Sequence, residues 1–318
     1  MGLSRRSSSR FGARAAALAV LATVATVCQS ELAAAPASAT VTVTSHFILT
    51  ATSSNTIDGF ITEINNDATN NDPDAILFVT PVFNSGGVCG CVDMTDPIAV
   101  YYVPGDQKWS IIDFVSGGYI PVGAEFNVLV VQKPSSSVFI AKATASNISG
   151  NGFTLNQKST VGKGTALLQV TQNYTPDGHQ VPSVNVHVPG VVYGLGSSGK
   201  QWDIQNVDNG AMPTGAAYDV MVGSGASNGG KAVLLTGSSA NTSGADSYIN
   251  NKQTNGNPNA AVFATQDADP NLNFGEGDPH PFGVGYATSP SDIEYVFNED
   301  GASMPTLTYY FNLLIFPS

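Results

Sequence analysis

Short runs of β-branched, aromatic and aliphatic residues alternate with polar clusters along most of the chain. Five such runs follow residue 45, namely HFILTATS, AILFVTP, PIAVYYV, KWSIIDF and AEFNVLVV. Clusters rich in Asn, Asp, Gly and Pro, such as NNDATNNDPD at 65–74, separate the runs and have the composition of turns. No stretch after residue 39 sustains the 3.6-residue period of a helix. The pattern therefore predicts an all-β chain.

Similar sequence segments then recur twice along the chain. AILFVT (75–80) is followed by ALLQVT (166–171) and AVFATQ (261–266), and WSII (109–112) by WDIQ (202–205) and IEYV (293–296). Two prolines recur every 92 residues, at 97, 189 and 281 and at 121, 213 and 305. We predict three tandem antiparallel β-sandwich or barrel-like units of about 90 residues, at 40–132, 133–225 and 226–318. Three independent domains and one composite body with pseudo-threefold symmetry both fit this pattern.

The first 39 residues read as an export signal. A basic start precedes an apolar run at 15–27 and the small residues ASA at 37–39, so we expect a signal peptide (1–39) and a secreted, extracellular protein. The apolar run is too short to span a membrane, and no transmembrane anchor is expected. Residues 40–318 hold 8 lysines, no arginine and 23 acidic residues, a net charge of 8 − 23 = −15. Nucleic acid is excluded as a partner, because its phosphates need clustered Lys and Arg.

The order of these sequence segments resembles that in an uncharacterised tandem domain of secreted bacterial proteins, a domain of unknown function. The resemblance rests on PVGAEFNVLV (121–130), TNGNPNAAVFATQ (254–266), HPFGVGY (280–286) and FNEDGASMP (297–305). It implies three copies of one fold unit and brings no activity, substrate or cofactor. In that family a histidine usually precedes the proline of the fourth strand. Here His280 keeps it, with Asp96 and Val188 at the matching places.

Motifs of catalysis are missing from the sequence. It has no Gly-x-Ser-x-Gly elbow, no His-Glu-x-x-His and no phosphate-binding glycine loop, and none of its four histidines recurs in all three units. His179 and His187 flank one loop and could hold a metal across a hairpin, although solvated loop histidines explain them more simply. We expect a protein that is not an enzyme, and a secreted hydrolase is the weakest alternative.

Two further motifs suggest a disulfide and a calcium site. Cys89 and Cys91, in VCGC, favour a disulfide with each other, while pairing between molecules or a soft metal are the alternatives. The segment DADPNLNFGEGD offers hard oxygen ligands at short spacing. If calcium binds, we expect its ligands to be Asp267, Asp269, Glu276 and Asp278; plain turns explain the same composition. No other cofactor is expected.

Recurring aromatic residues give the main indication of binding. The candidate ligand-binding set is Tyr101, Trp109, Tyr193, Trp202, Tyr286 and His280. Aromatic rings at equivalent strand positions suit either a sugar-stacking platform or the core of a small sandwich. We predict a secreted, noncatalytic protein that binds an extracellular glycan or a surface protein, with carbohydrate as the first ligand class. The alternative is a structural component of a cell-surface, spore or matrix layer.

Overall fold

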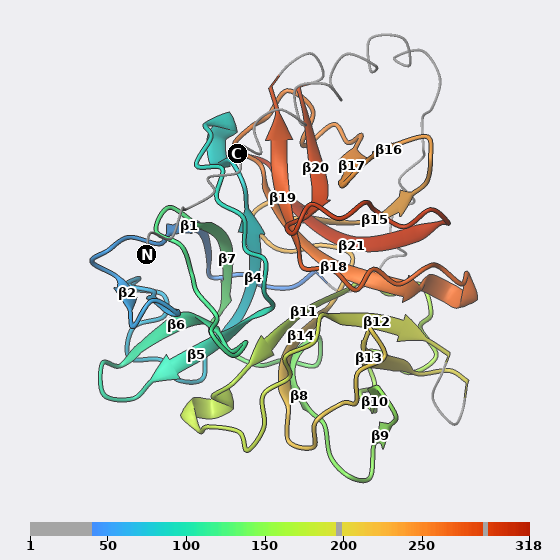
Figure 1. Cartoon of the computed structure of the whole chain (residues 1–318). Helices are drawn as coiled ribbons and strands as arrows, with labels where there is room; N and C mark the ends of the chain where they lie inside the picture. Colours follow the sequence, from blue (N-terminus) through green and yellow to red (C-terminus); the bar gives the residue numbers. More distant parts are fainter. Residues whose placement is uncertain (1–39, 195–198, 289–291) are drawn as a thin grey trace, which may run out of the picture.

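Strands dominate the computed structural model, which describes residues 40–194, 199–288 and 292–318 (Figure 1). The predicted signal peptide, 1–39, lies outside these residues. The described chain forms three seven-stranded sheets and three short 3₁₀ turns. No helix in these ranges is long and apolar enough to cross a membrane. The predicted all-β class is confirmed.

Unit 1 is a sandwich of a three-strand layer and a four-strand layer. The first layer holds β1 (Ser45–Thr50), β4 (Ile76–Val82) and β7 (Glu125–Val131), and the second holds β2 (Thr56–Ile57), β3 (Ile61–Glu63), β5 (Ile98–Val103) and β6 (Lys108–Asp113). Neighbouring strands within each layer are antiparallel. The core between the layers includes Trp109, Ile111, Phe126 and Val128. These are alternate residues of β6 and β7, because side chains of a strand point to its two faces in turn.

Units 2 and 3 repeat this arrangement. In unit 2 the three-strand layer is β8 (Val138–Lys142), β11 (Leu168–Asn173) and β14 (Ala217–Val222), and the other is β9 (Ile148–Ser149), β10 (Gly152–Leu155), β12 (Pro189–Tyr193) and β13 (Trp202–Asn206). Unit 3 has β15 (Lys231–Gly237), β18 (Ala261–Asp269) and β21 (Tyr309–Phe316) facing β16 (Thr242–Ser243), β17 (Asp246–Ile249), β19 (Phe282–Ala287) and β20 (Ile293–Asn298). The 3₁₀ turns η2 (Ser85–Gly87), η3 (Pro176–Gly178) and η4 (Pro270–Leu272) follow β4, β11 and β18. Three tandem sandwich-like units are therefore confirmed, and within the described residues no sheet closes into a barrel.

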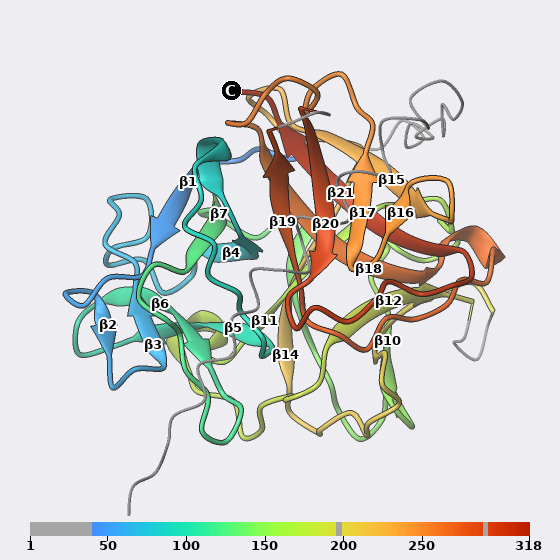
Figure 2. The same cartoon turned by 45° about the horizontal axis from the view of Figure 1, so that its top comes forward.

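Parallel strand pairs join the units edge to edge. The four-strand layer of unit 1 meets the three-strand layer of unit 2 through β5 and β11, unit 2 meets unit 3 through β12 and β18, and unit 3 returns to unit 1 through β19 and β4. Each seven-stranded sheet therefore belongs to two units. Figures 1 and 2 show the blue, green-yellow and orange-red units grouped around a common centre. The chain forms one composite body with pseudo-threefold symmetry.

Three threonines mark the pseudo-threefold axis. The hydroxyl oxygen of Thr171 accepts a hydrogen bond from Val79 N (3.0 Å), that of Thr265 from Val170 N (2.9 Å), and that of Thr80 from Ala264 N (3.1 Å). Each bond crosses from one unit to another, so the three bonds form a closed cycle. Buried N–H groups need such partners, because leaving one unpaired costs about 1–3 kcal/mol.

A fourth hydrophobic core lies where the three-strand layers meet. It takes residues from all three units, among them Phe78, Leu129, Met221, Phe263 and Phe316. The three-strand layers are therefore covered on both faces: β14 is buried at every position. This explains why β4, β7, β14 and β21 read as nearly continuous apolar runs, a pattern typical of strands with two buried faces.

Candidate functional site

Most of the candidate aromatic residues lie in the unit cores. Trp109 and Trp202 are fully buried, and Tyr193 and Tyr286 are nearly so. The indole nitrogens donate to backbone carbonyls, Trp109 to Asp72 at 2.8 Å and Trp202 to Lys163 at 2.9 Å. A sugar cannot stack on these rings, so the predicted platform is wrong for these four residues. Their recurrence reflects core packing, because each unit needs a large side chain on the inner face of its four-strand layer.

Tyr101 is the exception. It lies on the other face of β5, is half-buried, and contacts Tyr174 with a 5.6 Å separation of ring centroids. Phe114 packs against Tyr174 at 4.5 Å. Burial, with a smaller contribution from Tyr101, raises the pKa of Tyr174. This aromatic cluster covers the junction between units 1 and 2, so its evident role is to shield the parallel pair of β5 and β11.

The strand pairing corrects the repeat alignment around the histidines. The backbone carbonyls of Val188 and Pro281 accept matching hydrogen bonds, at 3.1 and 2.8 Å, from the residues that directly follow β13 and β20. Val188 is therefore the equivalent of Pro281, and His187 is the equivalent of His280. The assignment of Val188 to the histidine position is wrong, because unit 2 is one residue shorter there and the 92-residue proline spacing concealed the shift. Asp96 remains the unit 1 counterpart.

Both histidines pair with an aspartate in the same way. Nδ1 of His187 lies 2.6 Å from Oδ2 of Asp208, and Nδ1 of His280 lies 2.6 Å from Oδ2 of Asp300. The other oxygen of each aspartate accepts a backbone N–H at 2.9 Å. Burial alone would raise the pKa of Asp208, but the hydrogen bonds from Gly210 N and His187 lower it. About a third of each of these four side chains is exposed, so the pairs lie at the surface, where they restrict the conformation of the loops that carry them.

The four candidate calcium ligands are not brought together. Glu276 accepts a hydrogen bond from Leu307 N at 3.0 Å, and Asp278 accepts one from a side-chain amide of β20 at 2.9 Å. Asp267 and Asp269 are buried at the end of β18, where burial raises the pKa of Asp267 well above its usual range and that of Asp269 to about 6. Across the described ranges, no three or more His, Cys, Asp or Glu side chains gather as a metal would need. Neither His179 nor His187 belongs to such a group.

Cys89 and Cys91 are joined as a disulfide in the loop after η2. Their Cα atoms lie 4.9 Å apart, within the usual range for disulfides. The backbone N–H of Cys91 donates to Phe83 O at 2.9 Å. The small ring therefore lies against the end of β4, in the one unit that carries cysteines in residues 40–318.

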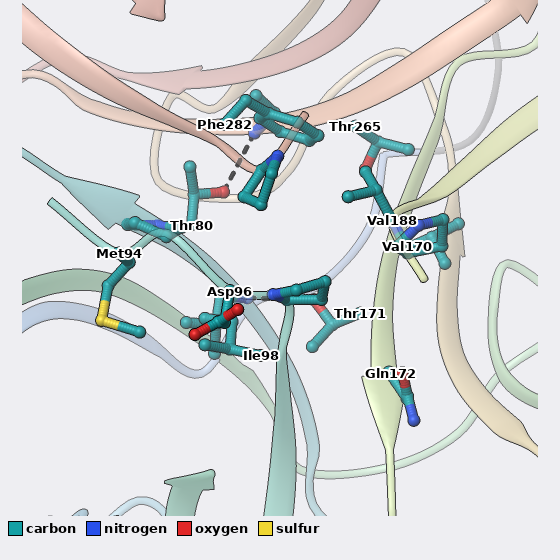
Figure 3. Close-up of a pocket in the computed structure, with 16 residues that line it drawn as sticks. Thr80, Met94, Asp96, Ile98, Val170, Thr171, Gln172, Val188, Thr265 and Phe282 are labelled. Carbon is teal, nitrogen blue, oxygen red and sulfur yellow. Dashed lines mark hydrogen bonds between the residues drawn. The ribbon is translucent and has the colours of Figure 1, made fainter. Parts of the chain in front are cut away.

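A pocket opens on the pseudo-threefold axis beside the threonine cycle, with a volume of about 70 Å³. Equivalent positions of the three units line it: Val79, Val170 and Ala264; Thr80, Thr171 and Thr265; Pro97, Val188 and Pro281; Ile98, Pro189 and Phe282. Figure 3 shows these side chains converging from three groups of strands. We call this the axial pocket.

Two polar side chains break the symmetry of the axial pocket. Asp96 and Gln172 line it, and no lysine or histidine is among its described lining residues. Behind Asp96 lies the buried Asp113, whose two carboxylate oxygens accept backbone N–H groups at 2.9 Å. Burial, and to a lesser extent the neighbouring Asp96, raises the pKa of Asp113. The pocket therefore offers an apolar lining, threonine hydroxyls and one acidic wall.

Several buried acids were missed by sequence reasoning, among them Asp219 and Glu294. Asp219 in β14 is fully buried, and burial raises its pKa to about 7. Glu294 in β20 is nearly as buried, and burial raises its pKa well above the usual range. A single acidic residue within an apolar strand segment is usually taken for a residue whose side chain points to solvent. The available signal was the comparison of the repeats, because Asn127 and Asn312 stand at the place of Asp219.

Comparison with known proteins identifies one family. The family model described as Domain of unknown function (DUF7452) matches residues 33–115, 105–222 and 190–315. No curated protein and no solved structure matches the chain. The three matches together cover most of the sequence, which agrees with the three units of the fold. The chain therefore belongs to the DUF7452 family.

Proposed function

We propose that this chain is a secreted, noncatalytic binding protein that receives a small group of an extracellular glycan in the axial pocket. One observation carries the proposal: three units close around a partly open pocket to which each contributes apolar side chains. Concave, mostly apolar sites with a few polar groups are the usual places for small ligands. Carbohydrate remains the proposed ligand class, but its proposed binding site is the axial pocket and not the aromatic rings, which are buried.

The volume and lining suit an acetamido group, as carried by N-acetylated sugars. A volume of 70 Å³ accommodates about five water-sized atoms. The valine and proline side chains provide contacts for a methyl group, while Asp96 can accept the amide N–H and Gln172 can donate to the carbonyl oxygen. An anionic group is disfavoured because Asp96 repels it and no described lining residue carries a positive charge.

Calorimetric titration of residues 40–318 tests this assignment. N-acetylglucosamine should bind, while glucose and glucosamine, which lack the acetamido group, should bind at least about tenfold more weakly. Asp96→Asn should weaken binding about tenfold, because a hydrogen bond to a charged group contributes about 1.5–3 kcal/mol. Asp106→Asn, in an exposed turn, is the matched control and should bind as wild type.

Absence of binding by a folded protein would reject the proposal, as would equal binding of all three sugars. One observation favours the structural alternative in that case. Three apolar side chains stand far out of the surface beyond the strand ends, Phe274 with 78%, Val88 with 73% and Leu307 with 68% exposure. Self-association that Phe274→Ser and Val88→Ser abolish would then identify a surface-layer component.

A further inference from the structure

Unit 3 lacks the core tryptophan of the other two units. In the antiparallel pairs of the four-strand layers, Tyr102 pairs with Trp109, Tyr193 with Trp202, and Tyr286 with Glu294. The strand pairing thus places Glu294, and not Ile293, at the tryptophan position. A glutamate is much smaller than an indole, so the space that tryptophan fills in units 1 and 2 is available for something else in unit 3.

Glu294 lines a small pocket at the seam between units 3 and 1. Its volume is about 20 Å³, and we call it the seam pocket. Unit 1 contributes residues of β1, β4 and β7, including Asn127, and Asn84 from the turn between β4 and η2, while unit 3 contributes Asn259, Tyr286 and Glu294. Asn84 holds the seam together, because its side chain bonds both to the backbone N (2.7 Å) and to the backbone O (2.6 Å) of Tyr286.

The Glu294 carboxyl group lines the seam pocket without a partner. The side chain is 4% exposed and makes no hydrogen bond or ion pair with any described residue. Lysine and histidine are not among the described lining residues. A buried charge without a partner is costly, so the group must either keep a proton or face a cation.

The remaining polar groups of the pocket favour oxygen coordination. Asn127 uses its amide nitrogen to donate to Val262 O at 3.0 Å, which leaves its amide oxygen for a ligand. Asn259 and Tyr286, whose side chains also carry oxygen atoms, line the pocket as well. Burial, followed by Asp292 and Glu294, raises the pKa of Tyr286. One carboxylate with neutral oxygens balances a single positive charge. A divalent ion such as calcium prefers several carboxylates and six to eight oxygens.

We propose that the seam pocket binds one monovalent cation, an alkali ion or ammonium, through the carboxylate of Glu294. The volume admits one or two water-sized particles, which suits a single small ion and excludes an organic ligand. Binding exchanges the carboxyl proton for the cation, so the proton is released to solvent. The ion lies where unit 3 closes the ring onto unit 1, and it therefore stabilises that closure.

Thermal unfolding in different chloride salts tests the site. At equal ionic strength and pH 7, one of sodium, potassium or ammonium chloride should raise the Tm of residues 40–318 by about 3 to 6 °C over choline chloride, with saturation. Glu294→Gln should abolish this salt-specific rise. Glu63→Gln, which removes a half-buried glutamate paired with Lys108, is the matched control and should keep the rise.

Proton release gives a second measurement that needs no variant. Adding the stabilising salt to wild type at pH 6 in a pH-stat should release up to one proton per chain, whereas choline chloride should release none. Identical Tm shifts for all four salts would overturn the proposal, as would equal salt responses of wild type and Glu294→Gln. If Glu294→Gln fails to fold, a salt-specific Tm rise without proton release would also overturn it.

Discussion

Asp219→Asn is the most informative substitution at the interface between units 1 and 2. Asp219 is fully buried in β14, where its carboxylate accepts hydrogen bonds from Leu77 N (3.0 Å) and from the side-chain amide of Asn173 (2.8 Å). It pairs with Thr171 of the threonine cycle, as Asn127 pairs with Thr80. Unit 2 thus carries a titratable group where unit 1 carries a neutral amide.

The magnitude follows from the shift in pKa. Burial raises the pKa of Asp219 from 3.8 to about 7 in the folded chain. The folded state then holds the proton more tightly than the unfolded state, so stability is greatest below about pH 4, falls as the pH rises to about 7, and is constant above. The full loss is about 4 kcal/mol, at 1.36 kcal/mol for each pH unit. Between pH 5 and pH 8 the loss is about 2 to 3 kcal/mol.

Urea unfolding of wild type and Asp219→Asn at pH 5 and pH 8 measures this loss. The asparagine places a donor against Asn173, whose own oxygen is held by Thr175 N at 2.9 Å, and this costs about 1–3 kcal/mol at either pH. The difference between the two pH values removes that constant cost. Wild type should lose about 2 to 3 kcal/mol more than the variant on going from pH 5 to pH 8. Asp106→Asn, in an exposed turn of unit 1, is the control and should follow wild type. Parallel behaviour of wild type and Asp219→Asn would refute the argument.

Three other changes test the axis, the cores and the disulfide by urea unfolding. Thr171→Val leaves one buried N–H of the threonine cycle unpaired and should cost about 1–3 kcal/mol; a loss below about 0.5 kcal/mol would show that the cycle contributes little. Trp109→Ala should cost about 3–5 kcal/mol because the indole is fully buried, whereas Tyr119→Ala on the surface should stay within about 0.5 kcal/mol. The bond between Cys89 and Cys91 closes only a very short loop, so its reduction should cost about 1–2 kcal/mol of unfolding free energy. Loss of the whole fold on reduction would contradict this.

The sandwich units were predictable because the apolar sequence segments form strands with one or two buried faces. AEFNVLVV becomes β7 (Glu125–Val131) and AILFVTP becomes β4 (Ile76–Val82), each within a residue or so of the expected run. The closure of the ring was not predictable. It depends on parallel pairing between strands that are about 70 residues apart, as for β5 and β11, or about 200 residues apart, as for β4 and β19. A short apolar run fits an independent sandwich equally well, because period and composition do not specify the edge partner.

The candidate sites were harder to predict because they depend on the exact register of the repeats. Alignment on prolines placed Val188, and not His187, beside His280, and it placed Ile293 beside the tryptophans. A shift of one residue turns every strand position to the opposite face of the sheet. Trp109 and Trp202 are equivalent, as are Tyr193 and Tyr286, but the strand pairing places Tyr102, and not Tyr101, at the tyrosine position of unit 1. Equivalence alone also cannot separate a core position from a surface platform. Burial decides that question, and burial depends on how the layers pack.

Triplication in one chain permits chemistry that a symmetric assembly of three identical units does not. In a symmetric trimer each position on the axis occurs three times, so one acidic residue beside the axial pocket would become three mutually repelling carboxylates. In this chain only one of the three equivalent positions Asp96, His187 and His280 carries a carboxylate beside the axial pocket, and Glu294 stands alone at one of three seams. The positions that close the ring, above all Thr80, Thr171 and Thr265, are identical in the three units. Identity is thus found where the geometry requires three equal contacts, and divergence is found beside the two pockets, which is why the pockets are the places to seek function.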